Sequence, residues 1–203
     1  MTRNGSYARH APVPVRRMSP CIRRTIPFFR IAVIACALLM PRNGPAQDTK
    51  PTEYEVEAAY LSNFGRFVEW PPRATANESF NVCVFGQDPF GAMLDGALKG
   101  ETIGGAPMAA KRLAGIEESA GCRILFISSS KEAQLPSVLT ALGTANVLTV
   151  SDMAGFTRRG GMIQFVLDGN RVRFEINLNA AQRAGLGLSS QLLKLATAVR
   201  RTP

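Results

Sequence analysis

The chain has 203 residues, a formal net charge of +9 and a single histidine, His10. This length fits one ordinary domain beside a short additional segment. Because His10 lies close to the amino terminus, Ser-His and Cys-His nucleophilic pairs and histidine-based metal sites are excluded from the rest of the chain.

Residues 1–46 have the features of an export signal. A basic start is followed by an apolar run at residues 31–40 and then by Gly44 and Ala46, the small-x-small pattern of a cleavage site. The apolar run is shorter than the about 20 residues of a transmembrane helix. The sequence therefore predicts a signal peptide that is cleaved after Ala46 and a periplasmic location, with an uncleaved membrane anchor as the alternative.

The positive charge belongs to this leader. Eight of the 24 Lys and Arg residues, and none of the 15 Asp and Glu residues, lie within residues 1–46, which leaves 16 basic residues against 15 acidic ones. A protein that binds nucleic acid needs a basic face toward the phosphates. The near balance of charge beyond the leader predicts no nucleic acid partner.

A short polar tether, residues 47–51, leads into a single predicted domain at residues 52–200. Thr52 and Glu55 form a capping box that opens a helix. Apolar residues follow at steps of three and four, which is the spacing of an amphipathic helix. We expect this helix to end where Trp70 is followed by two prolines.

Short apolar runs alternate with capped segments through the rest of the domain. The expected elements are strands at 80–86, 108–113, 123–127 and 146–150, a hairpin of strands 162–167 and 171–176, and helices that start at Asp88, at Ser129 with Glu132, at Asn179 with Gln182, and at Ser189, the last running to 199. Buried strands that alternate with helices favour parallel βαβ units. The sequence therefore predicts a three-layer α/β fold with a mixed, mostly parallel sheet and a C-terminal antiparallel hairpin.

Cys83 and Cys122 are the two cysteines beyond the leader. In an oxidising compartment pairing is the usual outcome for two such cysteines. A bond between them would close a loop of about 40 residues and stabilise the fold by roughly 4 kcal/mol in the chain-entropy model. We therefore expect a disulfide, with two free buried thiols as the alternative.

Two clusters are candidate contacts for another protein: Tyr60, Phe64, Phe67 and Trp70 on the first helix, and Arg158 and Arg159 in a glycine-rich loop. The aromatic residues either pack in the core or form a docking edge, because aromatic side chains concentrate at interface hot spots. The two arginines either lie in a plain connector or contact an acidic partner.

Two short motifs resemble catalytic loops without their essential partners. Residues 86–91 have the glycine spacing of a phosphate loop but lack its Lys-Ser/Thr, and residues 128–131 match S-x-x-K without the companion motifs. Both are more simply turns that cap helices. The sequence therefore predicts no catalytic residue, no cofactor and no metal site.

Four segments resemble the YfiR family of exported bacterial proteins. They are residues 58–71, which include Ala58-Ala59-Tyr60, residues 82–91, residues 122–128, and the stretches between 148 and 193. The segments occur in the family's order and span nearly all of residues 52–200. Cys83 and Cys122 fall where the family places a paired cysteine bridge.

The resemblance implies a periplasmic regulator and not an enzyme. The best-known member of the family restrains a membrane-bound diguanylate cyclase by engaging its periplasmic sensor domain, and its release raises cyclic di-GMP and favours biofilm. The expected partner is therefore a membrane diguanylate cyclase or a sensor kinase, with a homodimer also compatible. The competing interpretation is a periplasmic small-molecule sensor that acts with a sensor kinase.

Overall fold

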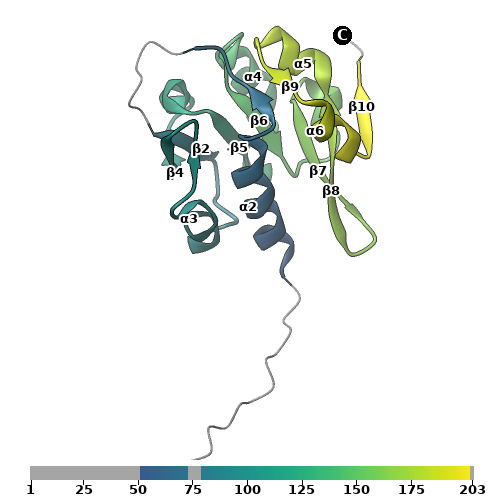
Figure 1. Cartoon of the computed structure of the whole chain (residues 1–203). Coiled ribbons are helices and arrows are strands. Elements are labelled where there is room, and N and C mark those ends of the chain that lie inside the picture. Colours follow the sequence, from purple (N-terminus) through teal and green to yellow (C-terminus); the bar gives the residue numbers. More distant parts are fainter. Residues whose placement is uncertain (1–50, 73–78, 202–203) are drawn as a thin grey trace, which may run out of the picture. The chain divides into compact units, whose positions relative to one another are not determined.

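The computed structural model describes residues 51–72 and 79–201 (Figure 1). The predicted signal peptide, residues 1–46, lies outside the described residues, as does all of the predicted tether but residue 51. None of the helices in the described ranges has the length and apolarity that a membrane span needs.

An eight-stranded sheet forms the centre of the domain, in the order β10-β8-β7-β6-β5-β2-β4-β3, and β1 and β9 form a separate two-stranded sheet. The strands are β1 (Val68–Glu69), β2 (Phe80–Phe85), β3 (Thr102–Ile103), β4 (Ala106–Leu113), β5 (Ile124–Ile127), β6 (Leu148–Ser151), β7 (Ile163–Asp168), β8 (Arg171–Asn177), β9 (Gly187–Leu188) and β10 (Ala198–Arg200). In the large sheet, β7–β8 and β3–β4 pair antiparallel and the other neighbours pair parallel. The predicted mixed, mostly parallel sheet with its antiparallel hairpin is confirmed.

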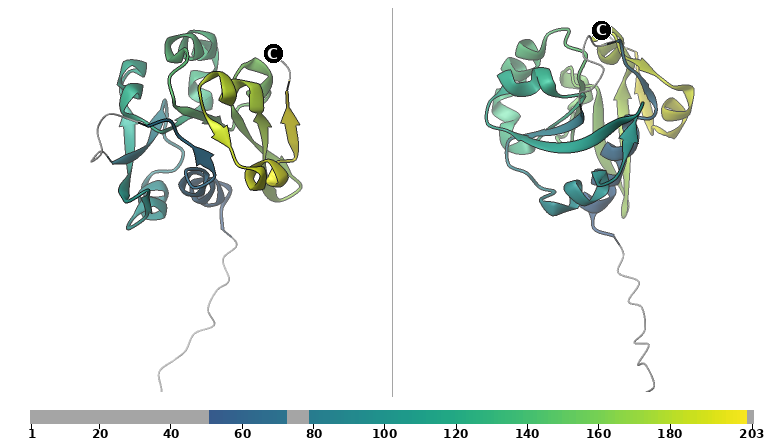
Figure 2. Two further views of the ribbon diagram at one scale, coloured as in Figure 1. Left: turned by 45° about the horizontal axis from the view of Figure 1, so that its top comes forward. Right: turned by 60° about the vertical axis from the view of Figure 1, so that its left-hand side comes forward.

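Helices cover both faces of the sheet (Figure 2). They are α2 (Glu53–Phe64), α3 (Ala92–Leu98), α4 (Leu135–Leu142), α5 (Leu178–Arg183) and α6 (Ser190–Leu195), with 3₁₀ turns η1 (Ile116–Gly121), η2 (Ser129–Gln134) and η3 (Thr157–Arg159). Successive residues of β2 point to opposite faces. Val82 therefore packs in the core with α2 and α3, whereas Cys83 packs in the core with α4. The domain thus has three layers, as the sequence predicts.

The first helix begins as predicted but ends earlier. Thr52 and Glu55 form the capping box, since each side chain accepts a hydrogen bond from the amide of the other. The helix ends at Phe64 with Gly65 as its C-cap, and a Cβ at Gly65 would lie 2.2 Å from the Ile103 side chain, so the close approach of Ile103 favours glycine here. The expected continuation toward Trp70 is wrong: β1 follows instead and pairs with β9.

The second helix starts later than predicted. Asp88 was expected to cap it, but α3 begins at Ala92. The Asp88 carboxylate accepts hydrogen bonds from the Phe90 amide (2.8 Å) and from Arg112 Nε on β4 (2.8 Å). It therefore stabilises the turn that precedes the helix and ties that turn to the neighbouring strand.

Three further helix boundaries differ from the prediction. The helix expected from Ser129 starts as the 3₁₀ turn η2, with α4 following it. Asn177 caps α5, because its side chain accepts from the Ala180 amide (3.0 Å), whereas Asn179 donates to the Arg201 carbonyl (2.9 Å). The last helix ends at Leu195, and β10 then pairs with β8. Of these differences, the pairing of β10 with β8 depends on a segment that is distant in the sequence, whereas the Asn177 cap is local.

Candidate partner-binding site

The two cysteines of the domain form a disulfide that joins neighbouring strands. Cys83 lies in β2, Cys122 lies between η1 and β5, and β2 and β5 pair in parallel. Both residues are fully buried. The pair therefore acts as a structural link, and its buried sulfur atoms leave no thiol at the surface for nucleophilic chemistry.

The aromatic stripe of the first helix packs into the domain. The Phe64 ring lies 5.3 Å from Phe174 and 5.9 Å from Phe165, and only 1% of Phe64 is exposed. Tyr60 stacks on Phe64 with a centroid distance of 5.8 Å. These contacts assign Phe64 to the core, which is the simpler of the two sequence interpretations.

The other two aromatic residues are partly buried beside the same core. Trp70 packs edge-on against Phe80 at 5.4 Å, and its indole nitrogen donates a hydrogen bond to the Gly65 carbonyl (3.2 Å). Arg123 lies over the Trp70 ring at 5.7 Å. The docking hypothesis for the stripe therefore depends on the exposed edges of Tyr60, Phe67 and Trp70.

The two candidate arginines lie on η3, and both are exposed. Arg159 forms an ion pair with Glu132 (2.8 Å) and donates a second hydrogen bond to the Glu132 carbonyl (3.1 Å). Phe156, just before η3, is buried in the core with α4, whereas Phe64 is buried in the core with α2. The aromatic stripe and the arginines therefore pack with different layers and do not form one site.

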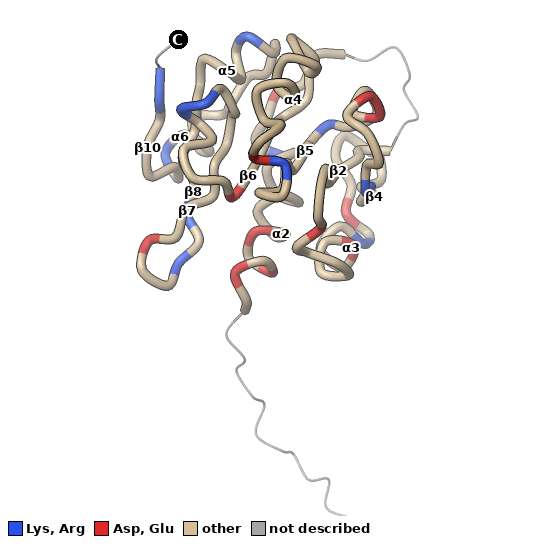
Figure 3. The backbone as a smooth tube through the Cα atoms, turned by 180° about the vertical axis from the view of Figure 1, so that it is seen from behind, with Lys and Arg blue, Asp and Glu red and all other residues tan. Residues whose placement is uncertain are grey.

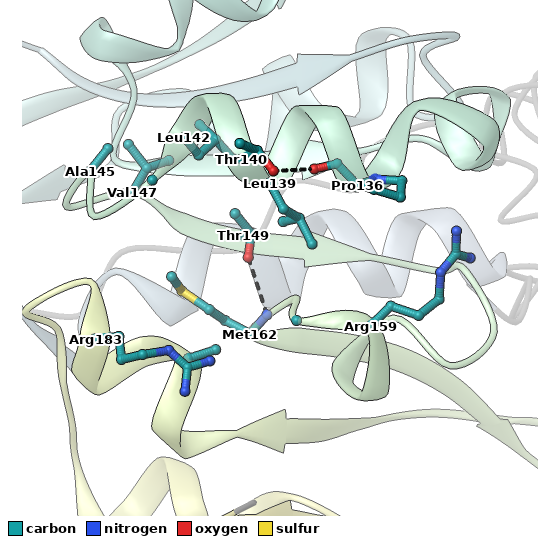
Figure 4. A pocket seen from close by; sticks show the side chains of 13 residues that line it. Pro136, Leu139, Thr140, Leu142, Ala145, Val147, Thr149, Arg159, Met162 and Arg183 are labelled. Carbon is teal, nitrogen blue, oxygen red and sulfur yellow. Dashed lines mark hydrogen bonds between the residues drawn. The ribbon is translucent and has the colours of Figure 1, made fainter. Parts of the chain in front are cut away.

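Arg159 also lies at one end of a groove between α4, the start of β7 and α5 (Figure 4). The groove has a volume of about 340 Å³. Leu139 and Met162 provide apolar surface, and Arg183 of α5 lies on the side opposite α4. The Thr149 hydroxyl accepts a hydrogen bond from the Met162 amide (3.1 Å), so this inner polar atom already has a partner.

The chemistry of this groove favours binding over catalysis. Its lining has two arginines but no carboxylate, thiol or imidazole, so it lacks a nucleophile with an adjacent base. Apolar surface flanked by guanidinium groups suits a segment with both apolar and acidic side chains. The groove lies near the amino ends of β6 and β7. Small ligands of open α/β sheets usually bind beyond the carboxyl ends of the strands, so this groove is not at the usual ligand position of such a fold.

At the carboxyl ends of β2 and β5, side chains fill the position where such a ligand would lie. The Ser130 hydroxyl accepts a hydrogen bond from the Gln87 amide (2.8 Å), and a Cβ on Gly86 would lie 2.6 Å from the same oxygen. Lys131 extends over the Phe85 ring at 4.8 Å. The loops at 86–91 and 128–131 thus pack against each other, in agreement with their interpretation as structural turns.

The buried acid Glu57, which lies near the half-buried Asp152, was not singled out from the sequence. Glu57 of α2 is 1% exposed, and burial, then the nearby Asp152 and Glu53, raise its pKa from 4.5 to about 8. Burial also raises the pKa of Asp152. Glu57 Oε2 and Asp152 Oδ1 have no hydrogen-bond partner among the described residues. Glu57 precedes Leu61 and Phe64 by four and seven residues, so helical spacing alone could have placed it on the buried face.

These acids do not form a metal site. Within residues 51–72 and 79–201, no group of three or more His, Cys, Asp or Glu residues is placed to hold a metal ion. At neutral pH the raised pKa keeps Glu57 largely protonated. The pair is therefore a source of pH-dependent stability.

The model of one protein family, described as DUF4154, YfiR/HmsC-like, matches residues 54–197. Among solved structures, the chain resembles the crystal structure of a conserved domain protein from Vibrio cholerae O1 biovar El Tor, with 10% identity and a TM-score of 0.52 over 73% of this chain. It also resembles an ABC domain from Streptococcus pneumoniae in complex with L-Trp, with 13% identity and a TM-score of 0.47 over 70% of this chain. The chain spans 60% of the length of each structure. The first likeness shows the fold alone, and the second carries no argument.

Proposed function

The chain belongs to the YfiR/HmsC-like family, and we propose that it is an exported regulator that binds the periplasmic sensor domain of a membrane signalling protein. The family consists of periplasmic, non-catalytic regulators of the diguanylate cyclase system. The family match over residues 54–197 carries the proposal. The specific action that we propose is repression of a membrane diguanylate cyclase, which lowers cyclic di-GMP and restrains biofilm formation.

Export is part of this proposal. Its support is the basic start, the apolar run and the small-x-small pattern of residues 1–46. A disulfide between Cys83 and Cys122 is compatible with the same location, because disulfides persist in oxidising compartments and are rare in the cytosol.

The regulator would act by binding one state of its partner more tightly than the other. A binding protein shifts a two-state equilibrium only by the difference between its affinities for the two states. The groove that Arg159 and Arg183 flank is our candidate contact, because its guanidinium groups complement an acidic partner surface. Arg158, exposed on the same 3₁₀ turn, adds to this positive charge.

An affinity purification tests the proposal directly. The tagged full chain is expressed in its own cell type, recovered with cross-linked periplasmic and membrane proteins, and the bound proteins are identified by mass spectrometry. We expect a membrane diguanylate cyclase or sensor kinase, and higher cyclic di-GMP in cells that lack the chain. Recovery of neither class, together with unchanged cyclic di-GMP, would contradict the proposal.

A small-molecule sensor is the second candidate. The groove volume of about 340 Å³ falls within the usual range for ligand pockets, roughly 300 to 1,000 Å³. A thermal-shift screen of periplasmic metabolites separates the two functions. Stabilisation by a metabolite that is lost in Met162→Trp, which fills the groove, would favour the sensor.

A further inference from the structure

The outer edge of β8 is only partly covered. On its inner side, β7 pairs with β8 from Arg171 to Ile176, whereas on its outer side β10 begins its pairing at Glu175. Among the described residues, no strand pairs with the outer edge of residues 171–174. Figure 1 shows this part of the β7–β8 hairpin projecting beyond β10. The hairpin therefore presents an open sheet edge.

The backbone of Val172 faces that open edge. The Phe174 carbonyl accepts hydrogen bonds from the amide (2.9 Å) and the hydroxyl (3.0 Å) of Thr197, which lies on the outer side just before β10. Along a strand, every second residue directs its backbone groups to the same side. The N–H and C=O of Val172, two residues before Phe174, therefore also point outward, where an added strand could bond to them.

Apolar side chains line one face of this edge. Leu167 and Val172 are opposite each other in the hairpin register, so their side chains share a face. They line an open groove of about 940 Å³ together with Val56 and Tyr60 of α2. Leu167 is 58% exposed, which is unusual for a large apolar side chain in the described part of the chain. A strand added at the edge would place alternate side chains beside this apolar face.

Positive charge occupies the other face. Arg171 and Arg173 alternate with Val172 and so leave the strand on the opposite side, although both also border the groove, as do Glu53 and Asp168. No carboxylate of the described residues lies within ion-pair distance of either guanidinium group. Figure 3 shows one further basic segment at the carboxyl end of β10, the next strand of the sheet, where Arg200 forms an ion pair with Glu175 (3.3 Å). An added strand would therefore gain from acidic residues at the positions between its apolar ones.

From this arrangement we propose that the outer edge of β8 at Val172 docks an extended segment of a partner protein, in which apolar and acidic residues alternate. The segment adds to the sheet as a strand, with main-chain hydrogen bonds providing affinity and the two faces providing specificity. The inference rests on the proposed function, because the regulated protein supplies the segment. A second copy of this chain fits poorly, since antiparallel pairing of two such edges would oppose arginine to arginine.

A blocked ten-residue peptide of alternating Val and Glu tests the edge without the natural partner. The protein is purified after expression of the full chain, and fluorescence anisotropy and amide hydrogen exchange are measured. We expect saturable binding, at least ten-fold slower exchange of the Val172 amide, and at least ten-fold weaker binding to Arg173→Glu. Lys99→Glu, an equal change of charge at an exposed position at the end of α3, should retain binding within three-fold.

Several outcomes would overturn this proposal. They are equal binding of a Val-Lys peptide, equal loss of binding in the Arg173→Glu and Lys99→Glu variants, and unchanged exchange at Val172 in the wild-type protein with bound peptide. Protection of Val172 that grows with protein concentration in the absence of peptide would instead assign the edge to a second copy.

The affinity purification separates this inference from the proposed function. Loss of the signalling partner in folded Arg173→Glu, with retention in Lys99→Glu, supports the docking edge. Retention in both variants overturns the docking edge and leaves the regulator function intact. Failure of the wild-type chain to recover any signalling partner contradicts the regulator function, whereas the peptide measurements still decide whether the edge accepts a strand.

Discussion

Cys83 and Cys122 are 39 positions apart in the sequence, yet their Cα atoms lie 5.9 Å apart within the core that α4 covers. The disulfide encloses β3, β4 and α3 in one covalent loop. Strand β2 pairs with β4 on one side and with β5 on the other. The covalent loop therefore links these central strands of the sheet.

Replacing both cysteines by alanine should lower the free energy of unfolding by about 4 kcal/mol, the chain-entropy value for a loop of this length. Urea denaturation followed by circular dichroism measures the change. In the wild-type protein, a mild reductant should break the bond only when urea is added, because both residues are fully buried. Equal urea midpoints for the wild-type and double-alanine proteins would contradict this prediction.

The buried carboxyl group of Glu57 should make the protein less stable as the pH rises. Its pKa is about 8 in the folded protein against 4.5 ordinarily, so between these values the folded state retains a proton that the unfolded chain has released. The free energy of unfolding should therefore fall from about pH 4.5 to about pH 8 and then level off.

In Glu57→Gln the free energy of unfolding should decline much less with pH. At pH 9 the loss should be smaller than in the wild-type protein by roughly 3 to 5 kcal/mol, since one pKa unit corresponds to 1.36 kcal/mol. Urea midpoints between pH 5 and pH 9 measure it. Glu118→Gln, at an exposed position, should leave the wild-type slope unchanged. A wild-type slope in the Glu57 variant would place the pH dependence elsewhere.

Phe64→Ala should destabilise the domain by about 3 to 5 kcal/mol, because it leaves a cavity among Tyr60, Phe165 and Phe174. Leu167→Ala also removes a large apolar side chain, but at a position that is mostly exposed, so its effect should stay below about 1 kcal/mol. Thermal unfolding compares the two variants. Similar losses would mean that Phe64 is not the core residue that its contacts indicate.

Arg159→Ala should reduce recovery of the signalling partner while leaving stability nearly unchanged. Its ion pair with Glu132 is exposed, and such pairs contribute about 0 to 1 kcal/mol. Arg66→Ala is the matched control, because it removes another exposed ion pair, with Glu101, without touching the groove. Affinity purification with each variant provides the comparison, and equal recovery would exclude Arg159 from the interface.

Local signals predicted several elements well. The hairpin was predicted because Gly169 and Asn170 form a turn between two apolar runs, and the structure pairs Asp168 with Arg171 across that turn. The capping box of α2 was predicted because both of its residues lie within one turn of the helix. In each case the residues that determine the structure are neighbours in the sequence.

Errors arose where a distant partner decides the conformation. Asp88 has the sequence signature of a helix cap, yet Arg112 of β4 holds its carboxylate in the turn before α3. Residues 198 and 199 were predicted as the end of the last helix, yet they pair with β8 as a strand. Helical spacing contains no information about a free strand edge elsewhere in the fold.

The α/β class, the alternation of strands and helices, the family and the two cysteines available for pairing follow from the sequence, because they depend on periodicity, composition and motif order. That Arg159 borders a groove and that Val172 lies on an open edge follow from the fold alone. Strand pairing and grooves depend on which distant segments pack together, and no local pattern specifies that choice.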